Sequence, residues 1–94
     1  MPEISRFYGI IIRIFTETGV QHHSPHIHAY YQEHKAVYGL EPIELLSGHL
    51  PRREHRLVEA WMELYKEELL ADWENAVSGK AVKKIPPLER KKGN

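Results

Sequence analysis

The chain has 94 residues and a mass of 11.0 kDa, which is enough for one domain and excludes a multidomain enzyme. Lysine and arginine together number 13, as do aspartate and glutamate, so the overall charge is zero and gives no argument for a nucleic-acid partner. The chain contains no cysteine, which excludes disulfides, thiolate nucleophiles and cysteine-based metal sites.

The chain begins Met1-Pro2-Glu3, without the basic start, apolar stretch and small-residue cleavage site of a secretory signal. Its longest apolar run is Ile10 to Ile12, far too short to span a bilayer. We therefore expect a cytoplasmic protein with no membrane partner. Residues 1–88 are expected to form a single domain, and the basic residues 89–94 a frayed tail.

Residues 7–15 are β-branched and aromatic and lack proline, which predicts a first strand covered on both faces. Arg13 stands on an otherwise apolar face of this segment, where a guanidinium needs a carboxylate, carbonyl groups or a bound anion. After a turn, residues 26–31 predict a second strand, residues 35–40 a third and residues 43–46 a short fourth. These segments predict an antiparallel meander.

The apolar period becomes helical from Arg52, with Pro51 well placed at the first helical position. The pattern continues to Val77 and ends at Ser78-Gly79. One helix of this length would be longer than the domain is wide, so we expect a break within residues 66–69 and two helices. Strands followed by helices predict an α+β fold, with a sheet of three or four strands packed against C-terminal helices. Three aromatic residues at helical spacing are predicted to pack on this sheet: Trp61, Tyr65 and Trp73.

Histidine is the outlier of the composition, because all seven histidines lie within residues 22–55 and four of them within residues 22–28. In the predicted second strand, His26 and His28 share one face, and the preceding turn can bring His23 to them. The three imidazoles suit general acid–base catalysis on a phosphodiester, binding of a phosphate or carboxylate, or a transition-metal site for zinc or nickel. The structural alternative is that His26 and His28 hydrogen-bond to backbone and hold a loop in place.

Three arginines are candidates for phosphate binding: Arg13, Arg52 and Arg53. Arg52 and Arg53 begin the predicted helix, where backbone amides also favour an anion. The alternative is that these two belong to a solvated helix face and pair with nearby glutamates. We expect Arg13 or the helix start to lie beside His26 and His28, so that proton carriers and an anion clamp meet in one place.

Several motifs occur in a recognisable order: Ile4 to Ile10, Ser24-Pro25-His26-Ile27-His28-Ala29-Tyr30, Gly48 to Pro51, Trp61, Glu68-Leu69-Leu70 with Trp73, and Lys84 to Leu88. From about residue 2 to residue 88 the sequence resembles the bacterial domain-of-unknown-function family 4160. The resemblance implies a gene pair like a toxin–antitoxin module, in which this chain is the toxin-like member beside a small antitoxin-like protein. It implies no chemistry, because the family is named for having no established activity.

We therefore expect a toxin-like protein that acts on RNA or another phosphate substrate through its histidines, with metal-independent, ribonuclease-like chemistry and no cofactor. Two alternatives remain open. The first is a non-catalytic module that binds the partner protein of the same two-gene system. The second is a protein that holds zinc or nickel through His23, His26 and His28. RNA and a second copy of the chain are further candidate partners.

Overall fold

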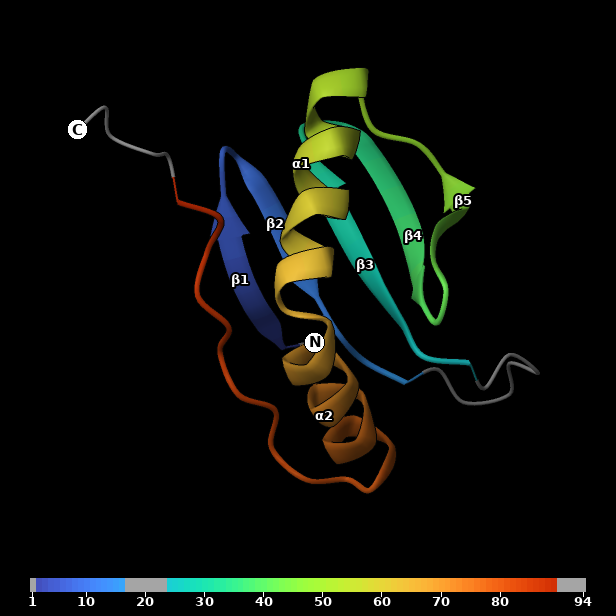
Figure 1. Ribbon diagram of the computed structural model, residues 1–94, viewed down its shortest axis with the longest axis vertical. Coiled ribbons are helices and arrows are strands. Elements are labelled where there is room, and N and C mark those ends of the chain that lie inside the picture. Colours follow the sequence, from blue (N-terminus) through green and yellow to red (C-terminus); the bar gives the residue numbers. More distant parts are fainter. Residues whose placement is uncertain (1, 17–23, 90–94) are drawn as a thin grey trace.

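The chain folds into an antiparallel meander followed by two helices, as the computed structural model shows for residues 2–16 and 24–89 (Figure 1). The five strands lie in the order β1-β2-β3-β4-β5, each paired with its neighbour in sequence. The elements are β1 (Glu3–Phe7), β2 (Ile10–Arg13), β3 (His26–Tyr31), β4 (His34–Leu40), β5 (Ile43–Gly48), α1 (Arg52–Leu64) and α2 (Lys66–Val77). The predicted α+β architecture is confirmed, but the sheet has five strands rather than three or four.

The additional strand arises because residues 7–15 contain a turn that the sequence pattern conceals. Tyr8 and Gly9 both have positive φ, 51° and 79°, and the chain reverses so that Phe7 pairs with Ile10. Two successive residues with positive φ are typical of the tight turns that match the twist of a hairpin. Glycine adopts this conformation readily, but tyrosine does so rarely. The prediction of a single strand over residues 7–15 is therefore wrong.

The helices cover one face of the sheet, and the core lies between the two layers (Figure 1). The core residues of the strands, together with Ile14 just after β2, are almost completely buried: Ile4, Phe7, Ile10, Ile12, Ile14, Ile27, Ala29, Ala36, Tyr38 and Leu40. Along β2 and beyond it the alternate residues Ile11, Arg13 and Phe15 are only half-buried. The expectation that this segment is covered on both faces is therefore wrong, because both described helices pack on the same side.

The two predicted helices are present and meet at Tyr65, one residue before the expected segment. Tyr65 leaves helical geometry with φ −118° and ψ 26°, which turns the chain between α1 and α2. The buried faces carry Trp61 from α1 and Leu69 and Trp73 from α2. Neither helix of the described chain combines the length and apolar character that crossing a bilayer requires.

After α2 the chain returns in extended form along the helices and β1 (Figure 1). We call residues 80–88 the strap. Three hydrogen bonds hold it, one to each of α2, α1 and β1: Lys83 N–H to Asp72 Oδ1 (2.9 Å), Trp61 Nε1–H to the Pro86 carbonyl (2.8 Å), and Ile85 N–H to the Ile4 carbonyl (2.8 Å). The strap thus covers the outer edge of β1 and connects it to both helices.

Trp61 is completely buried, and its substitution tests the core directly. We expect Trp61→Ala to lower the free energy of unfolding by about 3 to 5 kcal/mol, because it leaves a large cavity and removes the hydrogen bond to the strap. Urea denaturation measures the loss. The control is Leu64→Ala on the same helix, where the side chain is 66% exposed and the loss should stay below about 0.5 kcal/mol. A loss below about 1 kcal/mol for Trp61→Ala would contradict this core.

Asp72 makes stability depend on pH, because it is an acidic residue that is buried in the folded chain. Burial raises the pKa of Asp72 above its ordinary value, and this effect outweighs the opposing hydrogen bond from Lys83. The folded state therefore holds the proton more tightly than the unfolded state, and the stability from this group is lost as pH rises through the folded pKa. The substitution Asp72→Asn keeps the acceptor oxygen and remains neutral.

Urea denaturation should accordingly show Asp72→Asn gaining stability relative to the native chain as pH rises from about 4 to about 7. Asp72→Ala, which also removes the acceptor for Lys83 N–H, separates loss of charge from loss of the strap contact. A difference in stability between the native chain and the Asp72→Asn variant that is constant over this range, or that shrinks, would contradict the assignment.

Candidate functional site

His26 and His28 lie together at the start of β3, within an aromatic cluster. Their ring centroids are 5.2 Å apart, Phe15 stacks on His28 at 4.1 Å, and Trp73 packs against His26 at 4.8 Å. His26 Nδ1–H donates to the Ser24 carbonyl at 2.9 Å. Each histidine is only 7% exposed. The motif that dominates the sequence therefore forms packed structure, and little imidazole surface is open to a substrate.

Arg13 is the one predicted phosphate-binding arginine that lies beside this cluster. It stands opposite His28 in the β2–β3 register, and its guanidinium is 5.8 Å from the centre of the Tyr30 ring. His23 lies outside the described residues. Within residues 2–16 and 24–89, no three histidine, aspartate or glutamate side chains are grouped so that they could hold a metal ion.

The other two predicted arginines lie elsewhere. Arg52 and Arg53 begin α1, at the opposite end of the sheet from the start of β3 (Figure 1). The guanidinium of Arg53 lies 5.5 Å from the centre of the Tyr8 ring and 3.3 Å from the Glu54 carboxylate. Of the arginines expected beside His26 and His28, Arg13 lies there, whereas Arg52 and Arg53 lie at the other end of the sheet.

A second histidine pair lies at the same end of the sheet as Arg52 and Arg53. His34 begins β4 and His49 follows β5, and their ring centroids are 5.5 Å apart. The backbone N–H of His49 donates to the carbonyl of Lys35, the residue next to His34. This hydrogen bond holds His49 beside the start of β4. Tyr31 lies nearly parallel to the His34 ring at 6.4 Å. His34 is half-buried and His49 is exposed, so this pair is open to solvent where the first is not.

The topology explains why these residues meet. In an antiparallel meander, the β1–β2 turn, the β3–β4 turn and the end of β5 all lie at one end of the sheet (Figure 1). We call this the loop end, and its surface residues are Tyr8, Tyr31, Glu33, His34, Lys35, His49, Arg52, Arg53 and Arg56. Gly9 allows Tyr31 to lie against the first turn, because a Cβ there would stand 3.3 Å from the Tyr31 ring. Of this group the sequence pattern indicated Arg52 and Arg53 alone, because the members belong to three separate segments that only the fold brings together.

The loop end is locally basic although the chain is neutral. Four basic side chains are exposed there: Lys35, Arg52, Arg53 and Arg56. The acidic residues of the same segments are Glu33, which is exposed, and Glu54, which is 4% exposed and contacts Arg53. Most of the positive charge at this end therefore faces solvent, while one of the two opposing carboxylates is buried.

Tyr38, His55 and Glu59 are arranged like a hydroxyl, a base and an orienting carboxylate, but the Tyr38 hydroxyl lies in the core. The Tyr38 hydroxyl donates to His55 Nδ1 at 2.9 Å, and His55 Nε2 lies 3.3 Å from Glu59 Oε1. Burial raises the pKa of Tyr38 to about 12, and the charge of Glu59 contributes. The hydroxyl is therefore protonated at neutral pH, and with Tyr38 fully buried it has no access to a substrate. This chain of contacts instead fixes α1 to β4.

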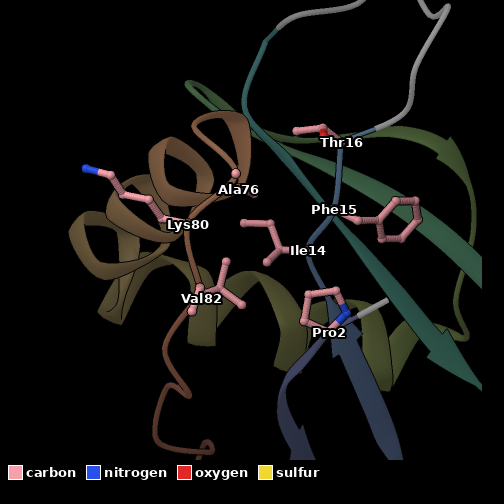
Figure 2. Close-up of a pocket in the computed structure, with 9 residues that line it drawn as sticks. Pro2, Ile14, Phe15, Thr16, Ala76, Lys80 and Val82 are labelled. Atoms are coloured by element: carbon pink, nitrogen blue, oxygen red, sulfur yellow. The ribbon is translucent and has the colours of Figure 1, made fainter.

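A hollow of about 450 Å³ lies between the end of β2 and the chain after α2 (Figure 2). Figure 2 shows Ile14 pointing into it, and both the Phe15 ring and the Lys80 ammonium pointing away. Its lining is mostly apolar: Pro2, Ile14, Phe15, Thr16, Ala76, Gly79, Lys80, Ala81 and Val82. None of the predicted site residues lines this hollow, so the loop end is the better candidate site.

The contrast between the two histidine pairs can be measured. We expect the double variant His26→Ala, His28→Ala to lose about 2 to 5 kcal/mol of unfolding free energy, because it removes two packed rings from an aromatic cluster. The matched variant His34→Ala, His49→Ala, at a more exposed pair, should lose less than about 1 kcal/mol. Urea denaturation of both variants is the measurement. A stable, fully folded first variant would show that His26 and His28 are not structural.

Comparison with known proteins was made on sequence and on structure. The family model described as Domain of unknown function (DUF4160) matches residues 9–74, from the first turn through most of α2. No curated protein and no solved structure matches the chain. The matched segment covers more than half of the sequence and includes both histidine pairs and the start of α1. The chain belongs to the DUF4160 family of domains of unknown function.

Proposed function

We propose that this chain binds single-stranded RNA at its loop end, as the toxin-like member of a two-gene pair. The observation that carries the proposal is the meeting of the His34–His49 pair with Arg52 and Arg53 at one exposed end of the sheet. Basic groups interleaved with aromatic rings are the combination that single-stranded nucleic acid requires, since phosphates need charge and bases need ring faces.

Phosphate binding is assigned to the start of α1 and its neighbours. Arg52 and Arg53 are both exposed, and the backbone amides of the first turn add to their field. No side chain caps this helix start by a hydrogen bond. Lys35 lies on β4, where its carbonyl accepts a hydrogen bond from His49, and its side chain adds to the positive surface. A chain of zero net charge can bind RNA in this way, because the contacts are local and not spread over the whole surface.

Base binding is assigned to the rings that line the same end. Tyr8, Tyr31 and His34 are each half-buried, so their positions are fixed while part of each ring remains accessible. Arg53 lies against Tyr8, and Tyr31 lies against His34, so each ring already has one neighbour. An unpaired base can add to such a ring without recognition of its sequence.

The His34–His49 pair replaces His26 and His28 as the proposed site of ribonuclease-like chemistry. One neutral imidazole accepts the proton of a ribose 2′-hydroxyl as its oxygen attacks phosphorus, and the other, protonated, donates to the departing 5′-oxygen. The products are a 2′,3′-cyclic phosphate and a free 5′-hydroxyl. The openness of this pair supports the assignment, since both rings reach solvent, whereas His26 and His28 are nearly closed off.

The proposal predicts which arginines matter. Arg52→Ala with Arg53→Ala should weaken binding of a fluorescent oligouridylate about tenfold and lower the salt slope of the logarithm of the affinity by about 1.4. The measurement is fluorescence anisotropy at several salt concentrations. The matched control, Lys83→Ala with Lys84→Ala, removes the same charge from exposed positions of the strap and should change affinity less than about twofold.

Equal losses in the two double variants would show that binding is nonspecific, and would contradict the site. His34→Ala with His49→Ala provides a second arm: it should weaken binding, because His34 is one of the base-binding rings, and it should abolish appearance of the cyclic phosphate even at protein concentrations that saturate the oligouridylate. If native protein binds the oligouridylate and leaves it intact, the acid–base assignment fails and the binding assignment stands. If no binding occurs at low salt, the proposed function fails.

A further inference from the structure

One edge of the sheet is covered by another segment of the chain, and the other edge is open in the described chain. The outer edge of β1 is covered by the strap, through the hydrogen bond between Ile85 and Ile4. At the other edge, no backbone hydrogen bond joins the outer side of β5 to any part of the chain that the structure describes. Residues Glu44 to Gly48 of β5 are all exposed. The edge of β5 therefore presents backbone donors and acceptors that can pair with another strand.

Two side chains at the middle of this edge are large, apolar and exposed. Leu45 is 39% exposed and Leu46 is 49% exposed, and both are among the few large apolar side chains on the described surface. The β4–β5 register shifts at this point, which leaves Leu46 as an extra residue that packs over Gly39. Within β5 there is no proline and no lysine, two of the features that commonly block an exposed edge; the register shift and the charge of Glu44 are the protective features that β5 does carry.

The charges along β5 show what kind of strand it fits. Its first half carries Glu44 and follows Glu41, both exposed. Its second half is followed by His49, which lies beside Lys35 and shortly before Arg52. One end of the edge is thus acidic and the other is mainly basic. A copy of the same strand in antiparallel orientation places acidic ends opposite basic ends, whereas a parallel copy places like charges together.

We propose that two copies of this chain associate by antiparallel pairing of β5 with β5, about a twofold axis near Leu45 and Leu46. The pairing joins the two sheets into one, satisfies the open backbone edge and buries four leucine side chains, two from each copy. The complementary ends of this single edge favour a second copy over a strand from another protein. This inference rests on the backbone edge and leucines of β5, whereas the proposed RNA site rests on the loop end; the two share His49, Lys35 and Arg52 at the basic end of the edge.

Sedimentation equilibrium over a range of concentrations tests the association. The native chain should approach twice the mass of 11.0 kDa, and Leu45→Lys should raise the dissociation constant about tenfold or more. The matched control is Leu64→Lys, which adds the same charge at a leucine that is more exposed and lies on α1. The control should associate like the native chain. A native mass of one chain at all concentrations would overturn the proposal, as would equal weakening by both substitutions.

Disulfide cross-linking tests the relative orientation of the two β5 strands. Because the chain contains no cysteine, any disulfide must form at the introduced residue. Under mild oxidation, Leu46→Cys should form a covalent dimer, because residues near the axis lie close to their own copies. Glu41→Cys should not, since antiparallel pairing places the two copies of residue 41 at opposite ends. Cross-linking through residue 41 but not residue 46 would overturn the arrangement, and so would a dimer that survives Leu45→Lys unchanged.

Discussion

Trp61 is the side chain on which the arrangement of the layers depends. Its ring packs against Phe7 of β1 at 5.1 Å and against Tyr65 at the helix junction at 6.0 Å. Its indole N–H binds the Pro86 carbonyl, so the same residue that fills the core also holds the strap. A tryptophan suits this position because it combines a large apolar surface with one donor that must find an acceptor when buried. The edge of β1, the helix junction and the C-terminal segment are therefore set by one residue.

Strand connectivity then decides which chemical groups meet. Because each strand of the meander reverses the chain, residues at alternate turns gather at the same end of the sheet. His26 enters at the end that α2 covers and becomes part of a packed cluster with Trp73. His34 and His49 come to the other end, where the described helices leave them accessible. Two histidine pairs with similar ring separations thus have different environments, one structural and one open.

Local pattern was sufficient for much of the fold. The alternation of residues 26–31 predicted β3 with its observed bounds, and the change of period at Arg52 predicted the start of α1. The turn at Tyr8 and Gly9 was missed because its one signal in the sequence is Gly9, and the tyrosine beside it rarely adopts the left-handed conformation that the turn requires. His34 and His49 could not be paired from sequence, since only the β4–β5 register brings them together. Density of histidine in the sequence pointed instead to His26 and His28, whose burial depends on Phe15 and Trp73 from distant segments.

The strap has a consequence for how far strand addition can proceed. A sheet with two free edges can add copies without limit, which is the route to fibres, whereas a sheet with one free edge is complete after a single addition. The hydrogen bond of Ile85 to Ile4 occupies the β1 side and leaves β5 as the edge that no described segment covers. For the proposed β5 pairing, the strap therefore limits assembly to two copies, and removal of residues 80–88 would expose a second edge at which further copies could add.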